Sequence, residues 1–234
     1  LFLCAGAPIP RVLLRKAAEL LPDLYVMSAW GMTENGIVTA TYPGDAEEKV
    51  FESDGRALPG QEVRVVDDCD DPVPANQEGR LQSRGPTTFV GYFNLPRAHN
   101  APEGAEWFET GDNARMDNEG YIRITGRSKD IIIRGGENVP VVEVEELIYR
   151  HESVVDAAVV AMPDERLGER GCAFVQLKPG CSLDLDALVA FLLEHKLTKN
   201  YLPERLELLE EFPRTPSGKI QKFKLRELAE TLAT

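Results

Sequence analysis

The sequence is poor in the residues that build metal sites and disulfide frameworks. Its 234 residues include only three histidines and four cysteines, which are Cys4, Cys69, Cys172 and Cys181. No two cysteines form a C-x-x-C pair and the histidines share no short motif, so we expect neither a zinc site nor a disulfide framework. Unpaired thiols suit a reducing compartment, and we therefore expect a cytoplasmic protein.

Basic residues are the minority among the charges. The chain has 26 Lys and Arg against 39 Asp and Glu, a net charge of -13. This balance argues against a nucleic-acid partner held through phosphate contacts. No apolar run approaches the ~18 residues that span a bilayer, so no transmembrane segment is expected. A chain of this length with 43% hydrophobic residues predicts a soluble globular protein of one or two domains.

The sequence also lacks an initial Met. It opens on the apolar run Leu1-Phe2-Leu3, which is too short for a signal peptide and has no basic flank. We interpret this run as the second half of a core strand, and we expect the chain to be a fragment of a longer protein.

The hydrophobic pattern predicts two regions of different character. Leu13, Ala17, Leu20 and Leu21 have helical spacing, and Pro10 marks the start of the helix that they predict. The expected elements of the first region are a helix over 10–21 and strands over 24–29, 62–66, 80–83 and 122–124. The second region is expected to alternate strands over 131–133, 154–161, 172–177 and 206–209 with helices that begin at Pro140, around Leu185 and before Leu225. We therefore expect an α/β and α+β protein with domains at 1–126 and 127–234.

The first candidate site is the segment from Trp30 to Glu34. It follows a predicted strand, and ligands bind at the carboxyl ends of strands in open α/β sheets. Thr33 supplies a hydroxyl and Glu34 a carboxylate, which suit a phosphate oxygen and a Mg²⁺ ion. The alternative is a loop with an exposed glutamate.

Two further segments carry groups that suit a nucleotide. Asp112, after Thr110 and Gly111, can accept two hydrogen bonds from a cis-diol such as ribose, although an aspartate after glycine is more often a turn residue. Arg127 lies at the proposed domain boundary, where its planar guanidinium can hold a ribose or a phosphate. The alternative for Arg127 is an interdomain charge cluster.

Two loops remain. Gly135 and Gly136 form a glycine-rich turn that lets a ligand approach the backbone, but their spacing excludes a dinucleotide fingerprint. Lys219 lies in the loop 213–220, which is not a Walker loop, and its ammonium group could neutralise two anionic reactants. The alternative for Lys219 is simple solvent exposure. The acidic run 67–71 lacks the glycine and distal glutamate of a calcium loop and is expected to be a hairpin turn.

Together these segments resemble one family. Seven segments resemble, in their order and spacing, the motifs of the adenylate-forming superfamily, which includes acyl-CoA synthetases and peptide-synthetase adenylation domains. These segments are 4–10, 30–34, 91–93, 110–112, 126–130, 134–138 and 213–220. The segments 126–138 and 163–172 look most like short- and medium-chain or cyclohexanecarboxylate-CoA ligases. The resemblance implies part of a large domain, with a sheet and a β-rich subdomain, followed by a small mobile α+β lid domain.

The resemblance also implies a reaction and roles for residues. A small carboxylic acid would react with ATP in the presence of Mg²⁺ to give an acyl-adenylate, and coenzyme A would then displace AMP. The implied nucleotide-binding residues are Gly6, Ala7, Pro8, Trp30 (beside the base), Gly31, Thr33, Asp112, Arg127 and Lys219. Thr33, Glu34 and Lys219 would act in catalysis, Glu34 would bind the metal, Lys129 would be the hinge, and Gly135 and Gly136 would line the tunnel for coenzyme A.

One departure limits this expectation. The family's phosphate-gripping Ser/Thr/Gly-rich loop belongs upstream of residues 4–10, and this sequence contains no such segment. We expect the upstream part of the same enzyme to supply it, so that the 234 residues are inactive alone. A peptide-synthetase or aryl-acid adenylation domain and a non-catalytic nucleotide-binding module stay open, and the identity of the acid is not indicated.

Overall fold

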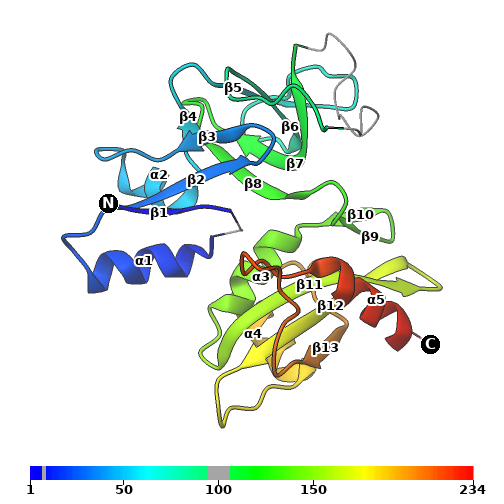
Figure 1. Cartoon of the computed structure of the whole chain (residues 1–234). Helices are drawn as coiled ribbons and strands as arrows, with labels where there is room; N and C mark the ends of the chain where they lie inside the picture. The colour runs from blue at the N-terminus through cyan, green and yellow to red at the C-terminus, as the bar shows by residue number, and fades with distance from the viewer. Residues whose placement is uncertain (7–8, 94–105, 234) are drawn as a thin grey trace. The chain divides into compact units, whose positions relative to one another are not determined.

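A computed structural model describes residues 1–6, 9–93 and 106–233 (Figure 1). The chain divides into two compact units, Leu1–Ser128 and Lys129–Thr234, and each is described by itself. This division lies two residues after the predicted boundary between 126 and 127.

The first unit opens with a four-stranded sheet in the order β1-β2-β3-β4. β1 pairs with β2 in parallel, whereas β2 and β3 form an antiparallel hairpin. The elements are β1 (Phe2–Cys4), α1 (Arg11–Leu20), β2 (Val26–Met32), β3 (Gly36–Ala40), α2 (Glu47–Glu52) and β4 (Arg56–Ala57). The strand predicted to end at Ala29 therefore continues to Met32, because the pairing with β3 extends it.

The helix predicted over 10–21 forms as α1, but its leucines do not mark its buried face. Leu14 is fully buried and Arg11 is 2% exposed, whereas Leu13 is 52% exposed and Leu20 is 78% exposed. The reason is an ion pair, since Arg11 Nη2 lies 2.6 Å from the Oδ1 atom of the buried Asp54, and this contact turns Arg11 toward the core.

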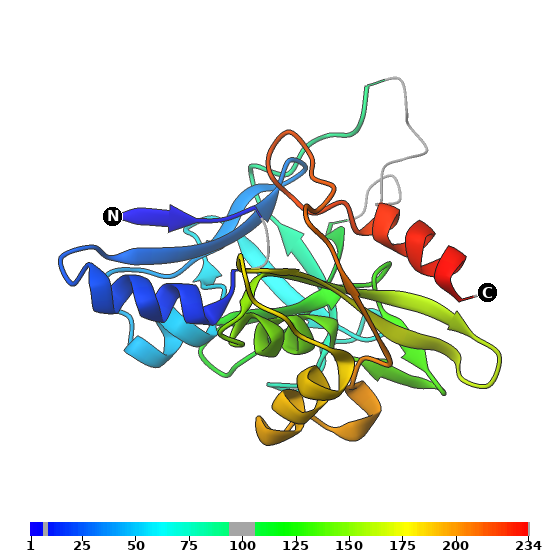
Figure 2. The ribbon, with the colours of Figure 1, turned by 90° about the horizontal axis from the view of Figure 1, so that it is seen from below.

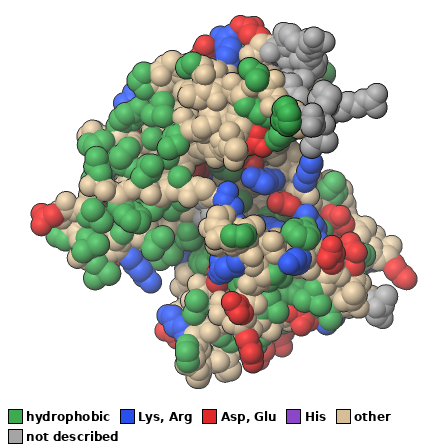
Figure 3. Space-filling model, viewed as in Figure 1, with side chains coloured by type: hydrophobic (Ala, Val, Ile, Leu, Met, Phe, Trp, Pro, Cys, Tyr) green, Lys and Arg blue, Asp and Glu red, His purple; other side chains and the backbone are tan. Residues whose placement is uncertain are grey.

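The strand at the chain start forms, but its burial differs from the prediction. Leu1 is 79%, Phe2 57% and Leu3 47% exposed, so β1 is not a core strand within the described residues. Figure 3 shows apolar side chains gathered over this part of the surface, where those of α1 also lie.

The second sheet of this unit is antiparallel, in the order β5-β6-β7-β8. Its strands are β5 (Glu62–Val66), β6 (Gly79–Arg84), β7 (Phe108–Met116) and β8 (Ile122–Arg127). Apolar side chains from both sheets share one core, which contains Trp30, Val38, Val65, Leu81, Ala114 and Ile122. This shared core fixes the end of β2 against β7 and β8.

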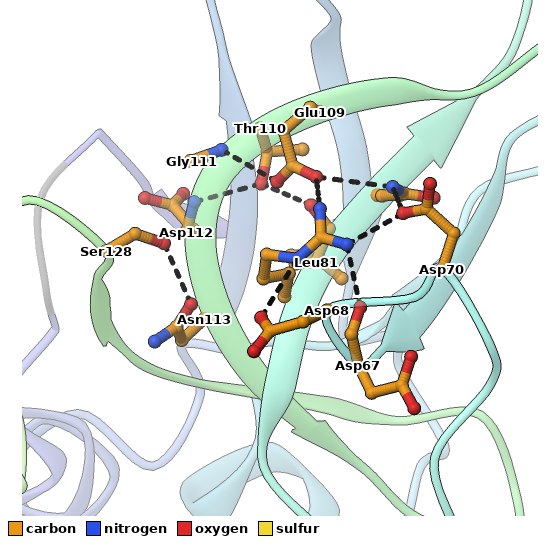
Figure 4. A network of polar contacts seen from close by, with 12 residues as sticks. Asp67, Asp68, Asp70, Leu81, Glu109, Thr110, Gly111, Asp112, Asn113 and Ser128 are labelled. Carbon is orange, nitrogen blue, oxygen red and sulfur yellow. Dashed lines mark hydrogen bonds and ion pairs between the residues drawn. The ribbon is translucent and has the colours of Figure 1, made fainter. Parts of the chain in front are cut away.

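The acidic run 67–71 forms the predicted turn. It follows β5 and is closed by an antiparallel bridge between Val66 and Pro72. Arg80 on β6 pairs with this run, with Nη2 2.7 Å from Asp70 Oδ1 (Figure 4). Arg80 also pairs with Glu109 on β7. The acidic run is thus tied into the sheet by ion pairs.

The second unit is built on a five-stranded sheet. β11 and β12 form its long central hairpin, β9 and β13 both pair with β12, and β10 pairs with β9. Its elements are β9 (Ile132–Arg134), β10 (Glu137–Val139), α3 (Val141–Tyr149), β11 (Val154–Asp164), β12 (Gly168–Leu177), α4 (Leu185–Glu194), the 3₁₀ turn η2 (Lys199–Tyr201), β13 (Arg205–Leu208) and α5 (Lys222–Leu232).

Both faces of this sheet are covered, as Figure 2 shows. Side chains of β11 point alternately to the two faces, so Ala157 and Val159 pack with α3 and α4 while Ala158 and Val160 pack with α5. Because both faces are buried, successive residues of β11 are nearly all apolar.

Candidate functional site

Three of the predicted nucleotide-binding residues meet in the first unit. Trp30 lies on β2, Asp112 on β7 and Arg127 at the end of β8, where it is the register partner of Asp112. The indole Nε1 of Trp30 donates a hydrogen bond to Asp112 Oδ2 at 2.8 Å. Arg127 Nε lies 3.2 Å from Asp112 Oδ1. Both carboxylate oxygens of Asp112 therefore have a donor from a different strand.

The exposure of these side chains decides what each can do. The Asp112 side chain is 7% exposed and that of Arg127 is 62% exposed. A buried carboxylate requires a compensating charge or hydrogen bonds, which Trp30 and Arg127 supply. The Trp30 ring, at 8% exposure, packs in the shared core, so its role in this structure is to hold Asp112 by its N–H group.

Asp112 is not the turn residue of the alternative interpretation. The Thr110 hydroxyl donates to the Leu81 carbonyl at 2.6 Å, and the Asp112 N–H donates to the Thr110 hydroxyl at 3.1 Å (Figure 4). Gly111 between them has φ +73°, a conformation that glycine adopts without strain. These contacts hold the segment within β7.

Thr33 and Glu34 follow β2 directly, at the carboxyl end of a strand as predicted, and they lie in the turn of the β2–β3 hairpin. The buried Asn35 closes this turn, since its N–H donates to Met32 O at 3.2 Å and its Oδ1 accepts from Met32 N–H at 2.9 Å. Gly36 follows with φ +67°. Asn-Gly is a strong hairpin signal, so the sequence contained the evidence for this turn.

Glu34 has a defined environment. The Tyr92 hydroxyl donates to Glu34 Oε1, and the Phe89 N–H donates to the Glu34 carbonyl at 2.7 Å. The hydrogen bond to the carboxylate raises the pKa of Tyr92 above its ordinary value. Thr33 beside it is exposed. The turn thus presents one carboxylate and one hydroxyl together.

This donor set fits a Mg²⁺ ion that arrives with a substrate. Mg²⁺ is commonly held by one or two carboxylates plus substrate phosphates and water, and Glu34 with Thr33 supplies the protein's share. Within the described residues, no cluster of three or more His, Cys, Asp or Glu side chains forms an all-protein metal cage.

Two of the predicted nucleotide-binding residues, Gly31 and Gly6, lie where the backbone itself favours glycine. A Cβ at Gly31 would lie 1.9 Å from the Gly36 carbonyl oxygen, so the hairpin itself requires glycine there. Gly6 lies in a bend after β1 with φ +89°. Ala7 and Pro8 lie outside the described residues.

The remaining predicted residues belong to the second unit. Lys129 is its first residue, and its carbonyl accepts from Arg226 at 3.4 Å. Gly135 and Gly136 form the two-residue turn between β9 and β10, with φ of +60° and +88°. The predicted glycine-rich turn is therefore a tight hairpin.

Lys219 lies in the predicted loop before α5. Backbone hydrogen bonds fold this loop on itself, with Thr215 N–H donating to Lys219 O at 2.8 Å and Gly218 N–H donating to Thr215 O at 2.8 Å. The Lys219 side chain is exposed, and no described residue of the second unit pairs with its ammonium group. The loop therefore presents a cation that is available to a ligand.

None of the helices in the described parts of the chain has the length and hydropathy needed to cross a membrane.

Comparison with known proteins identifies the family. Residues 1–93 match the model of the AMP-binding enzyme, and residues 143–219 match that of the AMP-binding enzyme C-terminal domain. The chain belongs to the AMP-binding family of adenylate-forming enzymes. The family match confirms the resemblance inferred from the motifs.

Individual relatives agree with this assignment. The chain is 44% identical to a medium-chain fatty-acid–CoA ligase of Escherichia coli over 96% of its own length and 40% of the relative. It is 40% identical to a salicylyl-CoA synthase / salicylate adenylyltransferase of a Streptomyces species, over 95% of its length and 40% of that protein. The chain thus spans about two fifths of the length of these relatives.

Solved structures confirm the fold class. ATP-bound MatB from Rhodopseudomonas palustris superposes with a TM-score of 0.90 at 30% identity, over 100% of this chain and 46% of that one. The predicted α/β and α+β architecture of an adenylate-forming enzyme is therefore correct.

Proposed function

We propose that the full-length protein that carries this sequence is an ATP-dependent carboxylate–CoA ligase. The observation that supports it best is Asp112, a buried carboxylate held by Trp30 with the exposed guanidinium of Arg127 beside it. Such a pair offers acceptors for a diol and donors for a phosphate. The names of the ligase relatives support the same reaction class.

The proposed reaction has two steps. A carboxylate oxygen of the acid attacks the α-phosphorus of ATP, a new P–O bond forms, and the bond to the β-phosphate breaks to release pyrophosphate. The thiol sulfur of coenzyme A then attacks the acyl carbon, and AMP leaves while the thiol loses its proton. Both steps bring anions together, so placed cations lower their barriers.

The first unit would hold the nucleotide. Asp112 would accept hydrogen bonds from the ribose hydroxyls, Arg127 would contact ribose or phosphate, and 6–8 would lie against adenine. Thr33 would bond a phosphate oxygen. Glu34 would hold Mg²⁺, which when bound supplies positive charge to the phosphates.

The second unit would act as a mobile lid. Residues 1–126 would belong to the large domain, and residues 127–234 would rotate about Lys129 between the two steps. Lys219 would bridge the carboxylate and the α-phosphate in the first step. Gly135 and Gly136 would line the path of coenzyme A in the second.

Lys219→Ala tests this proposal in the full-length protein. We expect acid-dependent exchange of pyrophosphate into ATP to fall roughly 100-fold, because removal of one preorganised donor to developing charge has about this effect. Thioester formation from preformed acyl-adenylate should change little. Lys224→Ala is the matched control, since Lys224 is exposed on α5. Unchanged exchange in Lys219→Ala would contradict the proposal.

A panel of acids tests the substrate class. Straight-chain, alicyclic and aromatic acids should each be offered with ATP and coenzyme A, because the relatives include both a medium-chain and a salicylyl enzyme. We propose a medium-chain or alicyclic acid. The 234 residues expressed alone should form no thioester, since the relatives carry more than half of their length outside the matched region.

Two other functions give different results in the same panel. A peptide-synthetase or aryl-acid adenylation domain would form an adenylate but use a carrier-bound thiol in place of coenzyme A. A non-catalytic module would bind AMP in a calorimeter and give no exchange with any acid.

A further inference from the structure

Two buried carboxylates of the second unit are paired with cations on either side of Lys219. Asp156 on β11 is 9% exposed and Glu145 on α3 is 6% exposed. Arg214 precedes Lys219 in its loop and pairs with Asp156, while Lys222 follows it and pairs with Glu145. The proposed function uses neither pair.

Asp156 receives hydrogen bonds on both of its oxygens. Arg214 Nη2 binds Oδ2, the Tyr149 hydroxyl donates to Oδ1, and the Ala157 N–H donates to Oδ1 at 2.9 Å. Burial and the negative charge of Asp156 raise the pKa of Tyr149, which keeps its phenol a donor. The carboxylate is therefore fixed before it holds Arg214.

Glu145 is fixed in a similar way. Its Oε1 accepts the Val159 N–H at 2.6 Å and lies 2.7 Å from Lys222 Nζ. Because Val159 is on β11 and Lys222 is the first residue of α5, one carboxylate joins α3, the sheet and the end of the lysine loop.

The Arg214 guanidinium connects this anchor to the lysine directly. While Nη2 binds Asp156, Nη1 donates to the Gly218 carbonyl at 2.8 Å, which is the peptide bond to Lys219. The Thr215 hydroxyl accepts the Lys219 N–H at 3.1 Å, and the Gln221 N–H donates to Pro213 O at 2.8 Å. The backbone groups of Gly218 and Lys219 are thus tied to Thr215 and Arg214, and Arg214 is held by Asp156 of the sheet.

Helix packing does not explain this arrangement. Leu225 and Ala229 of α5 already pack into the apolar cluster on that face of the sheet. Buried ion pairs add little stability compared with apolar packing, but they fix geometry. The ionic pairs therefore serve the position of the loop between them.

We propose that Asp156 and Arg214, with Glu145 and Lys222, are positioning residues that hold the Lys219 loop in the geometry required for adenylate formation. This inference rests on the proposed function. A displacement of about 1 Å in a catalytic group can cost about 100-fold in rate. The thioester step does not use Lys219 in the proposal and should be insensitive.

The experiment compares Asp156→Asn with Asp164→Asn in the full-length protein. Both residues are on β11. Among the described residues, Asp164 at the far end of that strand accepts from the Arg166 and Leu167 N–H groups and pairs with Arg170. In Asp156→Asn we expect kcat of adenylation to fall about 10- to 100-fold, with thioesterification of preformed acyl-adenylate within twofold. Asp164→Asn should leave both steps unchanged. In a Lys219→Ala background, Asp156→Asn should cause no further loss.

Hydrogen exchange supplies a readout independent of activity. The amides of Thr215, Gly218 and Lys219 should exchange about tenfold faster in Asp156→Asn, while those of β11 keep their protection. Unchanged exchange at these amides would overturn the inference, and so would equal losses in both half-reactions. Failure of the wild-type protein to exchange pyrophosphate would instead refute the proposed function, and the amide measurement would still decide whether the loop is held in this way.

Discussion

Replacing Trp30 by Phe tests the link between the protein core and the proposed nucleotide site. The substitution keeps an aromatic ring in the shared core but removes the N–H group that lies 2.8 Å from Asp112 Oδ2. Asp112 then keeps Arg127 as a charged neighbour and loses its donor from β2. We expect weaker and less specific placement of the ribose.

The structure sets the size of the effect. A hydrogen bond to a charged group contributes roughly 1.5–3 kcal/mol, and each 1.4 kcal/mol is a factor of ten. Arg127 is 62% exposed, so solvent screens its pairing with Asp112 and it replaces the lost donor only in part. We therefore expect kcat/KM for ATP to fall about tenfold to 100-fold.

The assay is the ATP dependence of acid-dependent adenylation in the full-length protein, with calorimetric binding of AMP as a second measurement. The control is Trp107→Phe, because Trp107 packs between the guanidinium groups of Arg64 and Arg84, at 4.4 and 4.6 Å from its ring centre, and makes no described contact with Asp112. In an Asp112→Ala background the Trp30 substitution should have little further effect. A Trp30→Phe protein that binds AMP and uses ATP as the wild type does would refute the reasoning.

Two further predictions concern the folded chain. Burial raises the pKa of Cys172 to about 12, so at pH 8 the native protein should react with iodoacetamide at the exposed Cys69 and Cys181 but not at Cys172, as peptide mass mapping can show. Because the thiolate is disfavoured in the folded state, stability should fall as the pH rises from 9 toward 12. Gly55→Ala should lower the free energy of unfolding by about 3 kcal/mol or more, since the added Cβ would lie 2.0 Å from the backbone of β3. Gly44→Ala should lower it by about 1 kcal/mol, because no heavy atom lies within 4 Å of the added Cβ and only its positive φ is unfavourable. Thermal unfolding measures both variants.

Hydrophobic periodicity predicted the second unit well. The helix predicted to begin at Pro140 forms as α3, and its apolar residues Val141, Val144, Leu147 and Ile148 are all buried. The pattern succeeds here because these apolar side chains pack in the core beside the sheet, with Glu145 the one buried charged residue of the helix. Proline at the helix start also marks the boundary clearly.

The same pattern predicted α1 as a helix but does not show which of its side chains are buried. Its leucines favour one face, but the structure buries Arg11, whose guanidinium donates to Ser53 O at 3.0 Å and pairs with Asp54. These partners are more than 40 residues away in the sequence. Local periodicity cannot report a buried charge whose partner is remote.

The candidate site was predicted residue by residue but not as an assembly. Trp30 and Asp112 are separated by 82 positions, and no spacing rule connects them. The turn that holds Glu34 follows a strand as predicted, but the hairpin that Asn35-Gly36 signals was not predicted. Asp156 and Glu145 were not singled out, because each reads as an ordinary acidic residue until the fold buries it beside a cation.

The acidic charge of the chain and its proposed anionic ligands are compatible for a local reason. A net charge of -13 repels ATP at long range, but the Debye length at physiological salt is about 8 Å, so groups beyond that distance contribute little. Within about 8 Å of a bound anion, the cations that attract it are those whose charge the carboxylates of the protein do not fully neutralise. Arg127 is largely exposed, and Lys219 has no partner among the described residues of its unit, whereas Arg214 and Lys222 are occupied by buried carboxylates. In the proposed function, Arg127 and Lys219 would therefore meet the ligand while Arg214 and Lys222 hold the loop, and the net charge of the whole chain would not decide what it binds.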